Sequence, residues 1–167
     1  MKIEVLQGDI TTFEADVIVT AANLFLRGGG GVDGAVHQAA GPELLEELKR
    51  FSGCETGDAV ITIAYNLNAK YVVHAVGPIY KDGESGEDKL LASAYEKSIV
   101  LAKSVDAESI LFPAISTGVY GYPLKPALTI AIDSIHKACK KNQTEMKVTM
   151  VCFNQETYQL ISELLEN

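Results

Sequence analysis

The chain has 167 residues, of which 47% are hydrophobic and 22% charged, and its formal net charge at pH 7 is −8. This size and composition suit one self-sufficient globular domain, which we expect to span residues 1–167. The acidic balance excludes a broad nucleic-acid surface, which needs clustered lysines and arginines. No stretch is apolar enough for a signal peptide or membrane span, so no membrane contact and a cytoplasmic location are expected.

The predicted elements alternate between strands and helices. Short apolar runs bounded by polar residues, glycine or proline predict buried strands, and apolar residues at helical spacing predict amphipathic helices. This alternation predicts an α/β fold with a mostly parallel sheet between helical layers. In chain order, we expect a first strand that ends before Gly8, a strand at 17–19, a helix from about 33, a helix at 42–51 and a strand at 71–73. An exposed loop at 81–88, a helix at 90–105, a strand at 110–112, a helix at 127–139, a strand at 147–153 and a last helix that Asn154 caps and that ends near 165 follow.

Four consecutive glycines, Gly28 to Gly31, follow the first buried strand. Such a run costs backbone entropy, and its usual use is close approach to a ligand with several N–H groups exposed as an anion nest. A flexible surface loop is the alternative, and the glycines alone favour a phosphate site only slightly over such a loop. The run lies between a strand end and a helix and is bracketed by Asn23 and Asp33, which favours a phosphate site.

A second glycine-containing loop, residues 113–123, follows the strand at 110–112. Ser116 and Thr117 add hydroxyl donors, and Tyr120 is placed to cover a sugar or a base. A tight turn with its tyrosines packed in the core is the alternative for this loop alone. Two such loops at strand ends favour a diphosphate clamp.

A third element, Gly8-Asp9-Ile10, is a weaker signal. Gly-Asp is common in turns, where Asp9 would cap Thr11 or Thr12. With the two loops, this element belongs to an ordered set of motifs that resembles the macro domain family, especially its hydrolytic MacroD-type branch. The resemblance runs nearly end to end and includes Gly8-Asp9-Ile10, Ala21-Ala22-Asn23, Gly28 to Gly34, His37-x-Ala39-Ala40-Gly41-Pro42-Glu43-Leu44, Thr56-Gly57-Asp58-Ala59, His74-x-Val76-Gly77-Pro78 and Phe112 to Pro123.

The resemblance implies a three-layer α/β/α sandwich around a mixed, mostly parallel sheet, with a cleft for ADP-ribose. It assigns adenine recognition to Asp9, the Ile10 backbone and the stacking ring of Phe153. It assigns the diphosphate to Gly30, Gly31, Val32, Ser116, Thr117, Gly118, Val119 and Tyr120, with the Tyr120 ring over the terminal ribose. It assigns that ribose to Asn23 and the hydrolytic step to Asp33.

The implied reaction is hydrolysis of the ester between ADP-ribose and Asp or Glu of modified proteins, and of O-acetyl-ADP-ribose. The partners would be ADP-ribose, its esters and mono-ADP-ribosylated proteins. The alternatives are a reader module that binds ADP-ribose without chemistry and a phosphatase acting on ADP-ribose 1″-phosphate. Two residues depart from the family pattern: Thr20 replaces the first Asn of the usual Asn-Ala-Ala-Asn, and Tyr80 stands where tryptophan is frequent.

No cofactor and no metal are predicted. The three cysteines, Cys54, Cys139 and Cys152, are odd in number and far apart, which favours reduced thiols over disulfides. No cysteine or histidine pair has a zinc-motif spacing. His37 and His74 are interpreted as hydrogen-bonded structural histidines, and Cys54 lacks a histidine neighbour that would make it a nucleophile.

Overall fold

A computed structural model describes residues 2–166 and contains one six-stranded sheet. The strand order is β1-β6-β5-β2-β4-β3. Neighbours from β1 to β4 pair in parallel, and only β3 runs antiparallel, against β4. The strands are β1 (Ile3–Gln7), β2 (Val17–Ala21), β3 (Ala59–Ile63), β4 (Tyr71–Ala75), β5 (Ser109–Phe112) and β6 (Lys147–Cys152).

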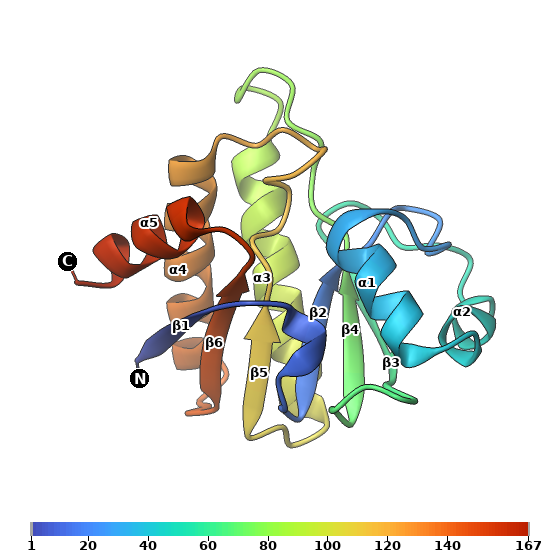
Figure 1. The fold of residues 1–167 in the computed structure, drawn as a ribbon. Helices are drawn as coiled ribbons and strands as arrows, with labels where there is room; N and C mark the ends of the chain where they lie inside the picture. The colour runs from blue at the N-terminus through green and yellow to red at the C-terminus, as the bar shows by residue number, and fades with distance from the viewer. Residues whose placement is uncertain (1, 167) are drawn as a thin grey trace.

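Helices cover both faces of the sheet (Figure 1). The three long helices pack on one face, and the two short helices with the 3-10 turn η1 pack on the other. The sheet therefore forms the middle of three layers, as predicted. The helical elements are η1 (Ile10–Thr12), α1 (Gly31–Ala40), α2 (Glu43–Leu48), α3 (Glu87–Ser104), α4 (Leu124–Lys141) and α5 (Gln155–Glu166).

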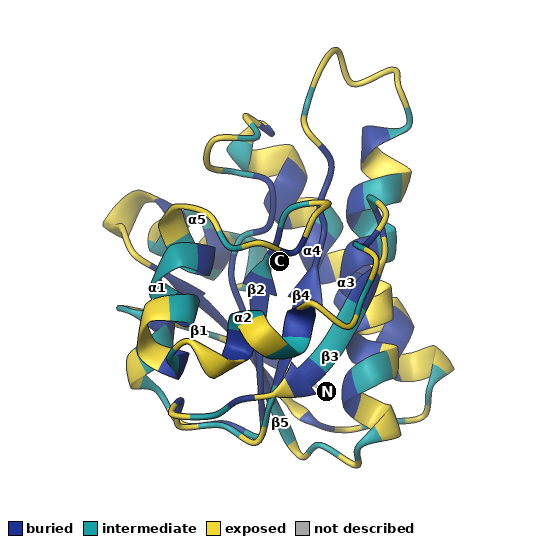
Figure 2. Ribbon diagram, turned by 90° about the vertical axis from the view of Figure 1, so that its right-hand side faces the viewer, coloured by how far each residue is buried: buried dark blue, intermediate teal, exposed yellow. Residues whose placement is uncertain are grey.

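Alternation along β2 explains why the central strands read as continuous apolar runs. Val17 and Val19 pack in the cluster beneath α3 and α4, whereas Ile18 between them packs in the cluster beneath α1 and α2. Successive side chains of a strand point to opposite faces, so a strand covered on both faces needs apolar residues at every position. Figure 2 shows these strands buried between helices whose outer faces are exposed. None of the helices within residues 2–166 is long and apolar enough to cross a membrane.

Residues 81–85 are exposed, as predicted, but Glu87 departs from the prediction of an exposed loop over residues 81–88. Its side chain is buried, and α3 begins at this residue, three positions before the predicted start. Its two carboxylate oxygens accept hydrogen bonds from the backbone N–H groups of Lys81, Asp82, Gly83 and Ser85. The amides, that of Lys81 most strongly, lower the pKa of the Glu87 carboxyl to about 2. The carboxylate thus fixes the polar loop to the first turn of α3.

We expect Glu87→Gln to lower the free energy of unfolding near neutral pH, because the amide replaces a charged acceptor with a neutral group that brings two donors of its own. A carboxyl whose pKa is depressed on folding stabilises the protein above its unfolded value of 4.5, and this contribution is lost as pH falls toward 2. Urea unfolding should therefore show a gap between wild type and variant that narrows across this range. A gap that stays constant with pH would contradict the assignment, and Glu84→Gln in the exposed part of the loop is the matched control.

Candidate functional site

Four segments that carry predicted site residues meet at one edge of the sheet. The strands β1, β6, β5 and β2 are parallel neighbours, so their carboxyl ends lie side by side. Residues 8–10 follow β1, Phe153 follows β6, the second loop follows β5, and the glycine run follows β2. The fold therefore brings the predicted adenine, phosphate and ribose residues to a common edge.

The glycine run leads directly into α1, which begins at Gly31, two residues before the predicted start. Its N-cap, Gly30, provides no side-chain hydrogen bond, so the first amides of the helix lack an acceptor. Gly31 has a φ of +59°, and a Cβ added at Gly30 or Gly31 would have no neighbour within 4 Å. These glycines face open space, and the uncapped helix N-terminus favours an anion there.

The hydroxyl groups of Ser116 and Thr117 in the second loop donate hydrogen bonds within the protein. Ser116 Oγ donates to the Pro78 carbonyl at 2.8 Å, and Thr117 Oγ1 donates to the Ala114 carbonyl at 2.8 Å. Ser116 adopts a φ of +71°, which this buried contact helps to hold. These two hydrogen bonds help to hold the shape of the loop.

Backbone amides of the same loop remain available. Within residues 2–166, the N–H groups of Gly118, Val119 and Tyr120 donate to no protein acceptor. Gly118 and Val119 are exposed and Tyr120 is half-buried. The loop therefore presents three amide donors at the edge it shares with the N-terminus of α1.

At the β1 end of the edge, Asp9 caps η1. Its Oδ1 accepts hydrogen bonds from the Thr11 amide at 2.9 Å and the Thr11 hydroxyl at 2.7 Å. This oxygen therefore caps the turn, which is the alternative role for Asp9. Ile10 is buried beside it, and Phe153, across from the end of β1, leaves 55% of its surface exposed. One carboxylate oxygen of Asp9 is thus bonded within the turn, and the exposed ring of Phe153 lies at the same end of the site.

Asn23 supports the loop that follows β2. Its side-chain Nδ2 donates to the Gly28 carbonyl at 2.8 Å, and its Oδ1 accepts from the amides of Phe25 and Arg27. The side chain is half-buried. Asn23 thus holds in place the residues that lead into the glycine run.

Asp33 lies in the first turn of α1, and its side chain is buried. Its Oδ1 accepts a hydrogen bond at 2.9 Å from the hydroxyl of Thr20, which is fully buried on β2. Burial raises the pKa of the Asp33 carboxyl above its ordinary value, although His37 and the Thr20 hydrogen bond pull the pKa down. A carboxylate with a raised pKa is better suited to accept a proton from water.

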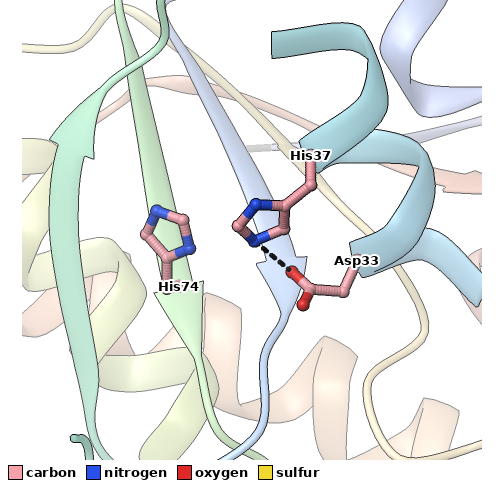
Figure 3. Close-up of side chains that lie close together, drawn as sticks. All are labelled: Asp33, His37 and His74. Carbon is pink, nitrogen blue, oxygen red and sulfur yellow. Dashed lines mark ion pairs between the residues drawn. The ribbon is translucent and has the colours of Figure 1, made fainter. Parts of the chain in front are cut away.

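Two histidines, predicted to be structural, lie near this carboxylate, with His37 between His74 and Asp33 (Figure 3). His37 Nε2 lies 3.7 Å from Asp33 Oδ1, one turn along α1. His74 on β4 is fully buried, and burial lowers its pKa to about 3. The sequence carries a signal for one of these neighbours, because Asp33 and His37 are spaced i, i+4 and so share a helix face. The pairing of Thr20 with His74 is seen only in the β2–β4 register.

Residues 19–131, which include both loops and Asp33, match the Macro domain model. The chain belongs to the macro domain family. Among curated relatives of this macro domain, an O-acetyl-ADP-ribose deacetylase of Escherichia fergusonii is 51% identical over 98% of this chain and 95% of the relative. A Macro domain-containing protein of Methanosarcina mazei is 49% identical over 98% of this chain and 88% of the relative.

Solved macro domains share the whole architecture. The Trypanosoma brucei macrodomain in complex with ADP-ribose aligns with a TM-score of 0.91 at 38% identity, covering 98% of this chain and 68% of that chain. The Oceanobacillus iheyensis macrodomain with ADP aligns with a TM-score of 0.90 at 38% identity, covering 98% of this chain and 90% of that chain. These alignments confirm the predicted family and the three-layer α/β/α fold.

The cysteines of this macro domain are free and buried. Burial raises the pKa of Cys54 to about 11, and the nearby carboxylates of Asp58 and Glu55 add to the shift. A thiol with this pKa is protonated at neutral pH and is a poor nucleophile.

Proposed function

We propose that this macro domain binds ADP-ribose along the carboxyl edge of the sheet and hydrolyses esters of the terminal ribose. The proposed substrates are O-acetyl-ADP-ribose and the Asp or Glu esters of mono-ADP-ribosylated proteins. The observation that carries the proposal is a buried carboxylate, Asp33, held by a hydrogen bond in the first turn of an uncapped helix. The E. fergusonii relative supports the acyl-ester class, and the T. brucei complex supports ADP-ribose as the ligand.

The diphosphate would bind between the two loops. The amides of Gly31 and Val32 on α1 and those of Gly118 and Val119 on the second loop present N–H groups from neighbouring strand ends. Because the protein carries a net charge of −8, attraction for an anion must come from these local dipoles rather than from the overall field. Gly30 leaves room for close backbone approach.

The two ends of the ligand would lie on either side of this clamp. At the adenine end, the Asp9 oxygen not used by Thr11 would accept from the amino group, the Ile10 backbone would lie beside the base, and the exposed Phe153 ring would stack on it. At the ribose end, Asn23 would fix the hydroxyl groups and Tyr120 would cover the sugar. Such orientation holds the scissile ester against Asp33.

In the proposed reaction, the Asp33 carboxylate takes a proton from a water molecule as the water oxygen bonds to the acyl carbon. The bond from that carbon to the ribose oxygen then breaks, and the ribose oxygen takes up a proton. The products are a carboxylic acid and ADP-ribose with a free hydroxyl group. General-base assistance of this kind contributes about 10²–10⁴-fold to a rate.

The test of this route is hydrolysis of O-acetyl-ADP-ribose in water enriched in the heavy oxygen isotope. Attack on the acyl carbon places the label in acetate, which mass spectrometry detects. Label found in ADP-ribose would instead show attack on the sugar carbon and would contradict the route. A reader module would release no product at all.

Thr20 is the residue through which the sheet holds Asp33, and its hydroxyl can be removed almost without change of volume. We expect Thr20→Val to lower kcat for ester hydrolysis by about 10-fold or more, because a hydrogen bond to a charged group contributes about 1.5–3 kcal/mol. ADP-ribose affinity, measured by calorimetry, should change little, because the phosphate amides are untouched. Thr20→Ser keeps the hydroxyl and should retain most of the rate. Equal rates for the Val and Ser variants would remove Thr20 from the mechanism.

A further inference from the structure

Three potential metal-ligand side chains converge beneath the N-terminal turns of α1. Asp33, His37 and His74 each offer one ligand atom, and these atoms all lie within 4.8 Å of one another. Asp33 and His37 come from successive turns of α1, whereas His74 comes from β4 (Figure 3). The arrangement thus rests on two secondary-structure elements rather than on a mobile loop.

The second observation is an unpartnered nitrogen aimed into this cluster. His74 is fully buried, and its Nδ1 is the only buried side-chain N or O atom within residues 2–166 that has no hydrogen-bond partner. Figure 3 shows this ring with a nitrogen directed toward His37 and Asp33. Leaving a buried polar atom without a partner is costly, so native proteins rarely do so.

The tautomer of His74 follows from its other nitrogen. The Thr62 hydroxyl donates its hydrogen to the Ile63 carbonyl at 3.0 Å, so its oxygen is left to accept from His74 Nε2, also at 3.0 Å. In this arrangement Nε2 carries the ring hydrogen, and Nδ1 carries a free lone pair. A metal ion would bind this lone pair, whereas a second hydrogen-bond acceptor would not.

The outer contacts resemble those that orient metal ligands. A ligating histidine usually donates its other ring N–H to a fixed acceptor, and a ligating carboxylate is itself hydrogen-bonded. Here Thr62 holds His74, and Thr20 holds Asp33 at 2.9 Å. Both supporting threonines are buried.

Two imidazole nitrogens and one carboxylate oxygen form a ligand set suited to zinc, with a fourth position left for water or substrate. Metal–ligand bonds of about 2.0–2.2 Å place tetrahedral ligand atoms about 3.3 Å apart. The separation of 3.7 Å between Asp33 Oδ1 and His37 Nε2 is close to this value. All three ligand atoms lie within 4.8 Å of one another, so they would move closer together to share one ion.

We propose that Asp33, His37 and His74 form a binding site for a divalent transition-metal ion of the zinc class. The bound ion would occupy the lone pairs with which Asp33 accepts a proton, so it would inhibit ester hydrolysis. This inhibitory part rests on the proposed function, whereas the binding of the ion does not. The site would make the enzyme sensitive to the free metal concentration.

Metal binding is tested on the full chain after removal of metal with a chelator. Calorimetry with Zn²⁺ should show one equivalent bound, and Co²⁺ should give the visible absorption of a four-coordinate ion. His37→Gln and Asp33→Asn should each weaken binding by at least about 10-fold, as loss of a ligand or of its support does. Both variants keep a polar side chain of similar size, so the test survives if His74→Gln fails to fold. The matched control is His136→Gln, at the exposed histidine of α4, which should bind as wild type.

Three results would overturn the site: no Zn²⁺ binding, binding unchanged in His37→Gln, or binding lost in His136→Gln. Hydrolysis is then measured with and without Zn²⁺, and a fall in rate that a chelator reverses is expected. A rate that rises or stays constant with the ion bound would overturn the inhibitory part. A protein that binds Zn²⁺ but hydrolyses no ester would contradict the proposed function while leaving the metal site in place.

Discussion

Asp33→Asn is expected to lower ester hydrolysis by about 10²–10⁴-fold, the usual contribution of a general base. Asparagine has nearly the same size and can still accept the hydrogen bond from Thr20, but it cannot take a proton from water. ADP-ribose affinity should stay within about 10-fold of wild type, because backbone amides rather than this anion hold the phosphates. The measurement is kcat on O-acetyl-ADP-ribose beside Kd from calorimetry.

The same variant should remain folded, because burial already disfavours the charged form of Asp33 and the substitution removes that charge. Asp133→Asn, at an exposed aspartate of α4, is the control for a change of net charge alone. Unchanged turnover would exclude Asp33 as the base. A loss of affinity as large as the loss of rate would assign it to binding instead.

The second large effect concerns the diphosphate. Adenosine is expected to bind at least about 100-fold more weakly than ADP-ribose, because each hydrogen bond to a charged group contributes about 1.5–3 kcal/mol and the two loops offer several. ADP, which keeps the diphosphate and lacks the terminal ribose, should retain most of the affinity. Calorimetry with the three ligands tests this order. Equal affinity for adenosine and ADP-ribose would contradict the assignment of the loops.

Those features of the fold that depend on local pattern could be predicted from the sequence. Buried strands such as β2 appear as continuous apolar runs, and the glycine run marks the loop that leads into α1. The edge strand β3 was not predicted, because only Ala59 and Thr62 of its five residues are buried and its pattern is not distinctive. The strand β3 is identified by its pairing with β4 and not by its sequence pattern.

Long-range contacts account for what the sequence did not predict about the site. The hydroxyl of Ser116 is bonded to Pro78, 38 residues away, so this partner has no local signature in the sequence. His74 meets Asp33 only because β4 pairs with β2 in one particular register, which places His74 opposite Thr20. The chemical type of a side chain is given by the sequence at its own position, whereas its contact partner depends on how the strands pair in the sheet.

The central claim is that this macro domain is an ester hydrolase rather than a reader. The most direct measurement incubates the wild-type protein with O-acetyl-ADP-ribose and, separately, with a glutamate-linked ADP-ribosylated protein, and quantifies released ADP-ribose. Release from both substrates with multiple turnovers is predicted. A protein that binds ADP-ribose but releases none from either ester would contradict the claim.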